Sequence, residues 1–385
     1  MNNFIYQNQT KVYFGKGSVG AHLKAVLGNY GDTVMLAYGS GSIKSNGIYD
    51  EVMGILKAAG KRVIEFSGIM PNPTYTKALE GAKLAREHQV DLILAVGGGS
   101  VSDCCKVVSA QAKLDEDIWE LEYTKNALPN QFIPLGTIIT LFGTGSEVNS
   151  EAVITNEEQK IKGAVWGAQP DFSFLDPSYT MSVPMKQFLS GVFDTLSHVM
   201  EIYFGKPDEN NLSDDMSEAV MRSIIRNIRV LLTDPNHYGA RSELEWASTV
   251  AETGILKMGK VTDFQCHMIE HQLGAYTDCS HGEGLAVIHP VLYRHIYKSG
   301  VARFARFAQN VWGIAPKGSE EETAAAGIDA LAAFIREIGL PTSFAELGIP
   351  ADTDLRAVAD SAILTAGCCK KLSHDEIYEI LKECR

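Results

Sequence analysis

The chain has 385 residues, 45% hydrophobic and 21% charged, which is typical of a soluble globular protein and long enough to predict two domains. The net charge of −13 disfavours nucleic acid and anionic membranes as partners, because phosphate binding requires a basic face. The seven cysteines form neither a disulfide framework nor a Cys-x-x-Cys site. With no signal-peptide pattern and no apolar run of membrane-spanning length, the sequence indicates a cytoplasmic protein.

In the first half, short apolar segments alternate with helical ones and often end in Gly/Ser turns. The expected strands are 4–14 (as a hairpin or two short strands), 33–38, 62–66, 91–96 and 132–139. The expected helices are 19–27, 49–59, 76–88 and 101–112. This alternation predicts a parallel, doubly wound sheet that binds ligands at the carboxyl ends of its strands.

The pattern changes after 176–177, where segments become longer and apolar residues recur with a period near 3.6. The expected helices are 213–233, 240–261, 301–311, 320–338, 355–365 and 375–384. The sequence therefore predicts an α/β domain over 1–180 and an all-α domain over 181–385. A cleft between two such domains would be the natural active site.

The helical half carries a carboxylate and imidazoles in two separate pieces. Asp194 and His198 are four residues apart. So are His267 and His271, and His281 follows them directly before a glycine. On a helix this spacing places two side chains on one face, so two facing helices can converge O and N donors on a divalent metal. Either pair alone is more often a helix-surface or capping contact, but together they favour a metal held by Asp194, His198, His267 and His281.

Two loops of small residues follow predicted strands. Gly97-Gly98-Gly99-Ser100 precedes a helix, where glycines let the backbone approach an anion and the helix N-terminus offers N–H groups. Pyrophosphate binding and a plain tight turn are about equally consistent, since Gly-x-Gly-x-x-Gly is absent. Thr140, Thr144 and Ser146 mark a second cradle or a connector. Asp103 is either a first-turn helix acid or a group at the cofactor or substrate cleft.

A third loop, Gly39-Ser40-Gly41-Ser42, follows the 33–38 strand and has Lys44 nearby. A carboxylate at such a position favours the 2′-hydroxyl of NAD and repels a 2′-phosphate. This loop has hydroxyls, free amides and a cation instead, so NADP(H) is the predicted cofactor. The alternative is a solvated turn with a surface lysine.

These stretches, in this order, resemble the iron-containing (group III) alcohol dehydrogenase family, especially its NADPH-dependent butanol dehydrogenase and aldehyde reductase branch. The matching stretches are 8–17, 38–44, 71–74, 97–103, 143–149, 194–201 and 267–284. Many family members have proline before the last histidine ligand, whereas Cys279-Ser280 precede it here. This departure concerns only the local turn.

The resemblance implies a dinucleotide-binding N-terminal domain, a helical metal-binding domain and ligation by the four residues above. It also implies that Asn72 lies at the cofactor and that His271 lies near the nicotinamide as a candidate proton shuttle. A homodimer, with 4–14 as an edge strand, is implied as well. Fe(II) is the first expectation for the metal and Zn(II) the second, since the donor set itself does not choose.

The expected reaction is reversible hydride transfer between NADP(H) and small primary alcohols or aldehydes such as butanol and butanal, with metal assistance. One alternative is a glycerol-type polyol dehydrogenase on the same fold. Another is a cyclising lyase of the dehydroquinate-synthase type, which the lack of a dense Lys/Arg cluster around Asp194 or His267 disfavours. A non-catalytic nucleotide sensor is disfavoured because every expected ligand is present.

Overall fold

The computed structural model describes residues 1–207 and 209–385. The chain divides into two compact units, one of residues 7–183 and the other of residues 1–6 together with 184–385. The sequence predicts a boundary at 180/181, with the first six residues in the α/β domain. The structure groups them with the helical unit instead, because the Asn2 N–H donates to the Gly259 carbonyl at 3.0 Å and the Met1 side chain lies against Gly259.

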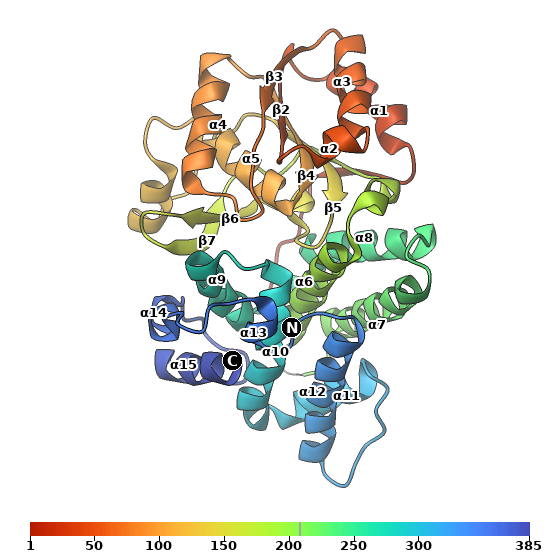
Figure 1. Cartoon of the computed structure of the whole chain (residues 1–385), viewed down its shortest axis with the longest axis vertical. Coiled ribbons are helices and arrows are strands. Elements are labelled where there is room, and N and C mark those ends of the chain that lie inside the picture. Colours follow the sequence, from red (N-terminus) through yellow and green to blue (C-terminus); the bar gives the residue numbers. More distant parts are fainter. Residues whose placement is uncertain (208) are drawn as a thin grey trace. The chain divides into compact units, whose positions relative to one another are not determined.

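A parallel sheet with the strand order β1-β8-β5-β4-β2-β3 forms the centre of the 7–183 unit (Figure 1). Its strands are β1 (Lys11–Phe14), β2 (Thr33–Tyr38), β3 (Arg62–Phe66), β4 (Leu92–Gly98), β5 (Leu135–Leu141) and β8 (Phe172–Leu175). A separate antiparallel pair consists of β6 (Glu151–Asn156) and β7 (Ile161–Trp166).

Helices cover both faces of this sheet, α1 and α3 on one side and α4 and α5 on the other (Figure 1). The helices of the unit are α1 (Ser18–Leu27), α2 (Ser42–Ser45), α3 (Ile48–Ala58), α4 (Tyr75–Glu87) and α5 (Gly99–Gln111), with short turns at Glu120–Thr124, Ser146–Val148 and Pro177–Ser182. Alternate residues of β2 divide between the two cores: Val34 and Leu36 pack with α1 and α3, whereas Met35 and Ala37 pack with α4 and α5. The prediction of a doubly wound sheet is confirmed.

Two predictions for this half need correction. Residues 4–14 do not form a hairpin, because only Lys11–Phe14 is a strand and it pairs in parallel with β8. The residues before it are fixed by side chains: the Asn8 amide donates to the Val148 carbonyl at 2.9 Å and the Thr10 hydroxyl to the Pro170 carbonyl at 2.8 Å. Strands β6, β7 and β8 were not predicted. Strand β8 has only four residues, all buried, so the run is too short for a period of two to be recognised.

The 184–385 unit is helical. Its helices are α6 (Met185–Tyr203), α7 (Leu212–Thr233), α8 (Tyr238–Glu252), α9 (Gln265–Thr277), α10 (His281–Ile296), α11 (Val301–Asn310), α12 (Glu320–Glu337), α13 (Phe344–Leu347), α14 (Leu355–Ser361) and α15 (His374–Glu383), with short turns at Ile255–Lys257 and Tyr297–Ser299. The predicted helix 240–261 is too long, because Gly254 adopts a left-handed conformation with φ 86° and ends the run. The predicted helix 355–365 ends at Ser361, and the Thr365 hydroxyl then binds Asp263.

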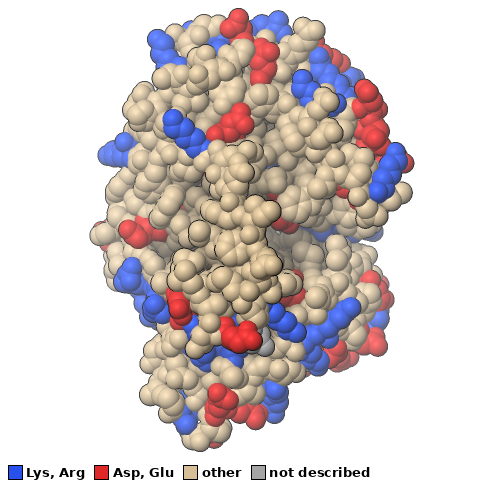
Figure 2. Space-filling model, turned by 180° about the vertical axis from the view of Figure 1, so that it is seen from behind, with Lys and Arg blue, Asp and Glu red and all other residues tan. Residues whose placement is uncertain are grey.

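No helix among the described residues combines the length and the apolar character needed to cross a membrane. On the face shown in Figure 2, Lys and Arg side chains are scattered among Asp and Glu side chains. The described residues on this face form no continuous basic stripe of the kind found on nucleic-acid-binding surfaces.

The packing of β5 against β8 yields a stability prediction. A Cβ atom on Gly136 would lie 2.1 Å from Cζ of the buried Phe172 ring, so we expect Gly136→Ala to lower the free energy of unfolding by about 1–3 kcal/mol. Gly54→Ala in α3, with nothing within 4 Å, is the control and should be neutral or stabilising by up to about 1 kcal/mol. Urea denaturation measures both. Equal midpoints for the two variants would contradict the packing argument.

Candidate active site: a metal centre and glycine loops

Three helices bring the four predicted ligands together. Asp194 and His198 lie on α6, His267 lies on α9, and His281 is the first residue of α10. His198 Nδ1 is 3.5 Å from Asp194 Oδ1. His267 Nε2 and His281 Nε2 are each 3.5 Å from the same oxygen. One carboxylate oxygen therefore has three imidazole nitrogens around it at equal distance.

This geometry fits a shared cation better than hydrogen bonds. Asp194 Oδ1, His198 Nδ1 and His267 Nε2 are buried and form no hydrogen bond with any described residue, which costs free energy unless something else satisfies them. A separation of 3.5 Å is long for a hydrogen bond. Two ligand atoms about 2.1 Å from one cation at a tetrahedral angle lie about 3.4 Å apart. The donor set therefore suits a divalent metal, and the role of each residue as a ligand stays a prediction.

The carboxylates at this centre favour the binding of a cation. Burial raises the pKa of Asp194, but the imidazoles of His198 and His281 outweigh it and hold that pKa well below its ordinary value. Burial lowers the pKa of His267, but the carboxylates of Glu201 and Asp194 outweigh it and raise that pKa to about 10. Burial also lowers the pKa of His198, which keeps a nitrogen lone pair available. Without a metal, a proton on His267 supplies the positive charge at this centre. A bound divalent cation would displace that proton.

Two glutamates bind the ring nitrogens of His267 and His281 that are not directed at Asp194. Neither glutamate was predicted to have this role. The ring Nδ1 of His267 hydrogen-bonds to Glu201, and the ring Nδ1 of His281 hydrogen-bonds to Glu270. Such partners fix the tautomer and direct the Nε2 lone pair toward the metal. The signal was present in the spacing, because Glu201 lies three residues after His198, and Glu270 three after His267, one helical turn away in each case.

His271 lies beside the convergence rather than in it. Its ring centroid is 5.4 Å from that of His281 and 5.9 Å from that of His267. It belongs to a neighbouring group with Glu270 and His281, whose donor atoms lie within 4.8 Å of one another. In that group Glu270 already binds the His281 ring, so the Asp194 centre is the stronger metal site. A catalytic role for His271 next to it stays a prediction.

Phe264 borders the centre in an unusual conformation. It has φ 56°, a region that costs energy for a bulky residue and persists where the surroundings enforce it. Its ring centroid lies 5.2 Å from that of His267 and 5.9 Å from that of His198. This backbone turn places an aromatic ring next to two of the predicted ligands, so this side of the centre is apolar.

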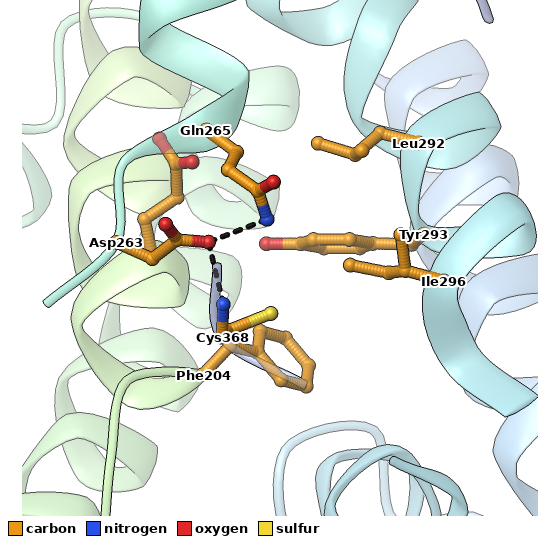
Figure 3. Close-up of a pocket in the computed structure, with 8 residues that line it drawn as sticks. Phe204, Asp263, Gln265, Leu292, Tyr293, Ile296 and Cys368 are labelled. Atoms are coloured by element: carbon orange, nitrogen blue, oxygen red, sulfur yellow. Dashed lines mark hydrogen bonds between the residues drawn. The ribbon is translucent and has the colours of Figure 1, made fainter. Parts of the chain in front are cut away.

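A small cavity lies next to Glu201 (Figure 3). It is lined by Glu201, Phe204, Asp263, Gln265, Leu292, Tyr293, Ile296 and Cys368. The Tyr293 hydroxyl points toward Asp263 and Gln265 in Figure 3 and has no hydrogen-bond partner among the described residues. The cavity offers about 10 Å³ to the centre of a water molecule, which is room for one water and far less than a substrate pocket needs. It is therefore a water-sized void and not a substrate site.

The glycine loops lie at the carboxyl ends of strands in the parallel sheet of the 7–183 unit. They follow β2, β4 and β5, which are neighbours in the order β5-β4-β2, so the carboxyl ends of these parallel strands lie together. Gly97 and Gly98 end β4, and Gly99 and Ser100 begin α5, whose N-terminus has no side-chain cap. These N–H groups suit an anion.

The same loops also pack on each other. A Cβ atom on Gly99 would lie 2.1 Å from Thr144 Oγ1, and the Ser100 hydroxyl donates to the Pro71 carbonyl. Thr140, at the end of β5, is half-buried. Glycine at position 99 is thus required by packing, as in a tight turn, and pyrophosphate binding by this loop stays a prediction.

Three predicted cofactor residues already have protein partners. Asp103 accepts hydrogen bonds from the Ser146 hydroxyl at 2.5 Å and the Val153 N–H at 3.1 Å. Asn72 Oδ1 accepts from Lys162 Nζ at 3.1 Å. Asp103 is therefore buried and held by the protein within α5. Cofactor contacts by Asp103, Ser146 and Asn72 stay predictions.

The loop after β2 presents a more open surface. Gly39 is half-buried, its carbonyl accepts from the Gly68 N–H at 3.0 Å, and Ser40 and Ser42 are exposed. Lys44 Nζ lies 3.6 Å from Glu65 Oε2. The prediction of a phosphate site rested on the loop and on Lys44 and did not include this carboxylate, which comes from the adjacent strand β3.

The support of His267 by Glu201 yields a prediction about metal affinity. Glu201→Gln keeps the side-chain shape and removes the charge, so we expect metal binding to weaken about 10- to 100-fold. Competition with a chelator, using Zn(II), measures the dissociation constant. Glu218→Gln is the matched control, because Glu218 is also buried but hydrogen-bonds to Tyr203 and Arg306 instead. Unchanged affinity in Glu201→Gln would exclude this role.

Family models and relatives agree with this site. Residues 9–177 match the model described as iron-containing alcohol dehydrogenase, and residues 188–384 match the C-terminal model of the Fe-containing alcohol dehydrogenase family. The chain is 40% identical over 391 residues to a probable NADH-dependent butanol dehydrogenase 2 of Bacillus subtilis, covering 99% of both chains. It is 35% identical over 353 residues to an NADPH-dependent aldehyde reductase of Escherichia coli, covering 91% of this chain and 90% of the relative.

The fold is also similar to that of a solved structure. The crystal structure of NADH-dependent butanol dehydrogenase A from Thermotoga maritima superposes with a TM-score of 0.93 and 34% identity, covering 100% of this chain and 99% of the other. With both family models matched along nearly the whole length, the chain belongs to the iron-containing alcohol dehydrogenase family.

Proposed function

We propose that this protein is a metal-dependent alcohol dehydrogenase and aldehyde reductase that transfers hydride reversibly between a nicotinamide cofactor and primary alcohols or aldehydes such as butanol and butanal. One observation carries the proposal: three imidazole nitrogens surround Asp194 Oδ1 at 3.5 Å. The relatives named as butanol dehydrogenase and aldehyde reductase support the substrate class.

The side chains at the site have separate roles in the proposed reaction. When bound, the metal supplies a Lewis acid for the carbonyl group and the nicotinamide supplies the hydride. Asp194 with the three histidines gives one anion and three neutral donors, which leaves a dication net positive and suited to stabilise negative charge on oxygen. His271, next to this centre, exchanges the proton that the alcohol oxygen gains or loses. Phe264 makes one side of the centre apolar.

NADP(H) is the preferred cofactor in this proposal, and Fe(II) is the preferred metal, with Zn(II) second. Gly39 supports the cofactor preference because it places no carboxylate at the loop after β2, and Lys44 lies nearby. The relatives include both NADH-dependent and NADPH-dependent enzymes by name. The family description supports iron.

The proposal includes a homodimer in the cytoplasm. Strand β1 is at the end of the sheet order and pairs with β8 on one side, so it is an edge that a second copy of the chain can cover. Phe14 on this strand is exposed. All seven cysteines are free thiols, as in reducing compartments.

His267→Ala tests the metal assignment. We expect this variant to lose bound metal and butanal-dependent NADPH oxidation, because it removes a ligand and leaves Glu201 buried without its imidazole. Metal analysis and NADPH absorbance measure the two effects, with glycerol and propane-1,3-diol oxidation assayed in parallel for the polyol alternative. His295→Ala, which removes a partner of Glu376 instead, is the control. Full metal content with wild-type activity in His267→Ala would refute the proposal.

Gly39→Asp tests the cofactor placement. A new carboxylate against the 2′-phosphate should shift the ratio of kcat/KM values toward NADH by about tenfold or more. A Cβ atom at this position lies 3.2 Å from the Ile69 carbonyl, so Gly39→Asn is needed to measure the steric part alone. If the aspartate and asparagine variants show the same ratio, charge at this loop does not select the cofactor.

A further inference from the structure

A compact cluster of four side chains adjoins the Gly39–Ser42 loop; we call Tyr38, Lys44, Tyr49 and Glu65 the Glu65 cluster. Tyr38 is the last residue of β2, and Glu65 lies on the neighbouring strand β3. Tyr38 Oη donates to Glu65 Oε2 at 2.5 Å, and Tyr49 Oη donates to Glu65 Oε1 at 2.8 Å. Both carboxylate oxygens are thus fixed by phenols.

The strand register explains why these residues meet. Glu65 pairs with Leu36 across the parallel β2–β3 ladder. Tyr38, two residues beyond Leu36, is on the same face of the sheet. Glu65 is therefore held beside the residue that directly precedes Gly39, although it lies far from that loop in the sequence.

Lys44 is bound to the same carboxylate. Its Nζ is 3.6 Å from Glu65 Oε2, with 49% of the lysine side chain and 42% of the glutamate side chain exposed. The ammonium also lies 5.0 Å from the centre of the Tyr38 ring and 4.5 Å from that of Tyr49, within cation–π range. Lys44 is therefore positioned and still accessible to a ligand.

The cluster carries one positive and one negative charge. The hydrogen bond from Tyr38 is the main reason that the pKa of Glu65 lies below its ordinary value, so the carboxylate is ionised at neutral pH. Hydrogen bonding to Tyr38, ahead of the attraction of Glu65, raises the pKa of Lys44. The positive charge that favours a phosphate at this loop is thus offset by a carboxylate beside it.

We propose that Glu65 is a specificity-determining residue that limits the preference for NADPH over NADH. The inference rests on the proposed function, which places the adenosine ribose at the Gly39–Ser42 loop. A 2′-phosphate there is attracted by Lys44 and repelled by Glu65. A 2′-hydroxyl suffers no repulsion and can donate a hydrogen bond to a carboxylate. The Lys44–Glu65 pair therefore lets one loop accept both cofactors, and each member favours a different one.

Glu65→Gln and Lys44→Gln test the two halves of this pair. In the full-length protein, cofactor fluorescence gives separate dissociation constants for NADPH and NADH. We expect Glu65→Gln to raise the NADPH preference about tenfold and Lys44→Gln to lower it by a similar factor. Both shifts should shrink at high salt, since the groups are partly exposed.

Glu80→Gln is the control for net charge, because Glu80 pairs with Lys77 on α4 and should not change the ratio. If Glu65→Gln weakens both cofactors equally or leaves the ratio unchanged, Glu65 has only a structural role and the inference is overturned. If the wild-type protein binds neither cofactor, the proposed function itself fails. These two failures are therefore distinguishable.

Discussion

Three helices of the helical unit meet around one buried oxygen atom. Asp194 Oδ1 is surrounded at 3.5 Å by ring nitrogens of His198, His267 and His281, so α6, α9 and α10 must all be in place to form the centre. Burying a carboxylate without a compensating charge costs several kcal/mol. Behind His267 and His281, Glu201 and Glu270 add two more buried carboxyl groups. This excess of buried carboxyl groups is why we expect a divalent cation to stabilise the helical unit as well as to take part in the chemistry.

Much of the metal centre could be predicted because its spacing is local. The four-residue steps from Asp194 to His198 and from His267 to His271 survive in α6 and α9. Glu201 and Glu270 also lay one turn from a histidine, but an acid at helical spacing is common on exposed surfaces. Only burial against a ring nitrogen gives these two acids a role, and burial depends on how three helices pack.

Prediction of the sheet from the sequence is limited in the same way, because it uses only local patterns. Strands with strong apolar runs, such as Thr33–Tyr38, could be predicted, whereas the short strand Phe172–Leu175 could not. The charge argument for the cofactor considered neighbours along the chain around Gly39 and Lys44. Glu65 reaches that loop across the β2–β3 ladder, and pairing between strands is tertiary information that a linear pattern does not contain.

Asp263 joins a late part of the chain to the start of a ligand helix. Its carboxylate accepts hydrogen bonds from the Thr365 hydroxyl and from the Gly367 and Cys368 N–H groups, and it lies four residues before His267. These partners are 102 to 105 residues further along the chain. During synthesis on the ribosome, Asp263 can form these hydrogen bonds only after the segment around Thr365 has been made. The contacts that hold the start of α9 are therefore completed after α6 and most of the helical unit have been synthesised.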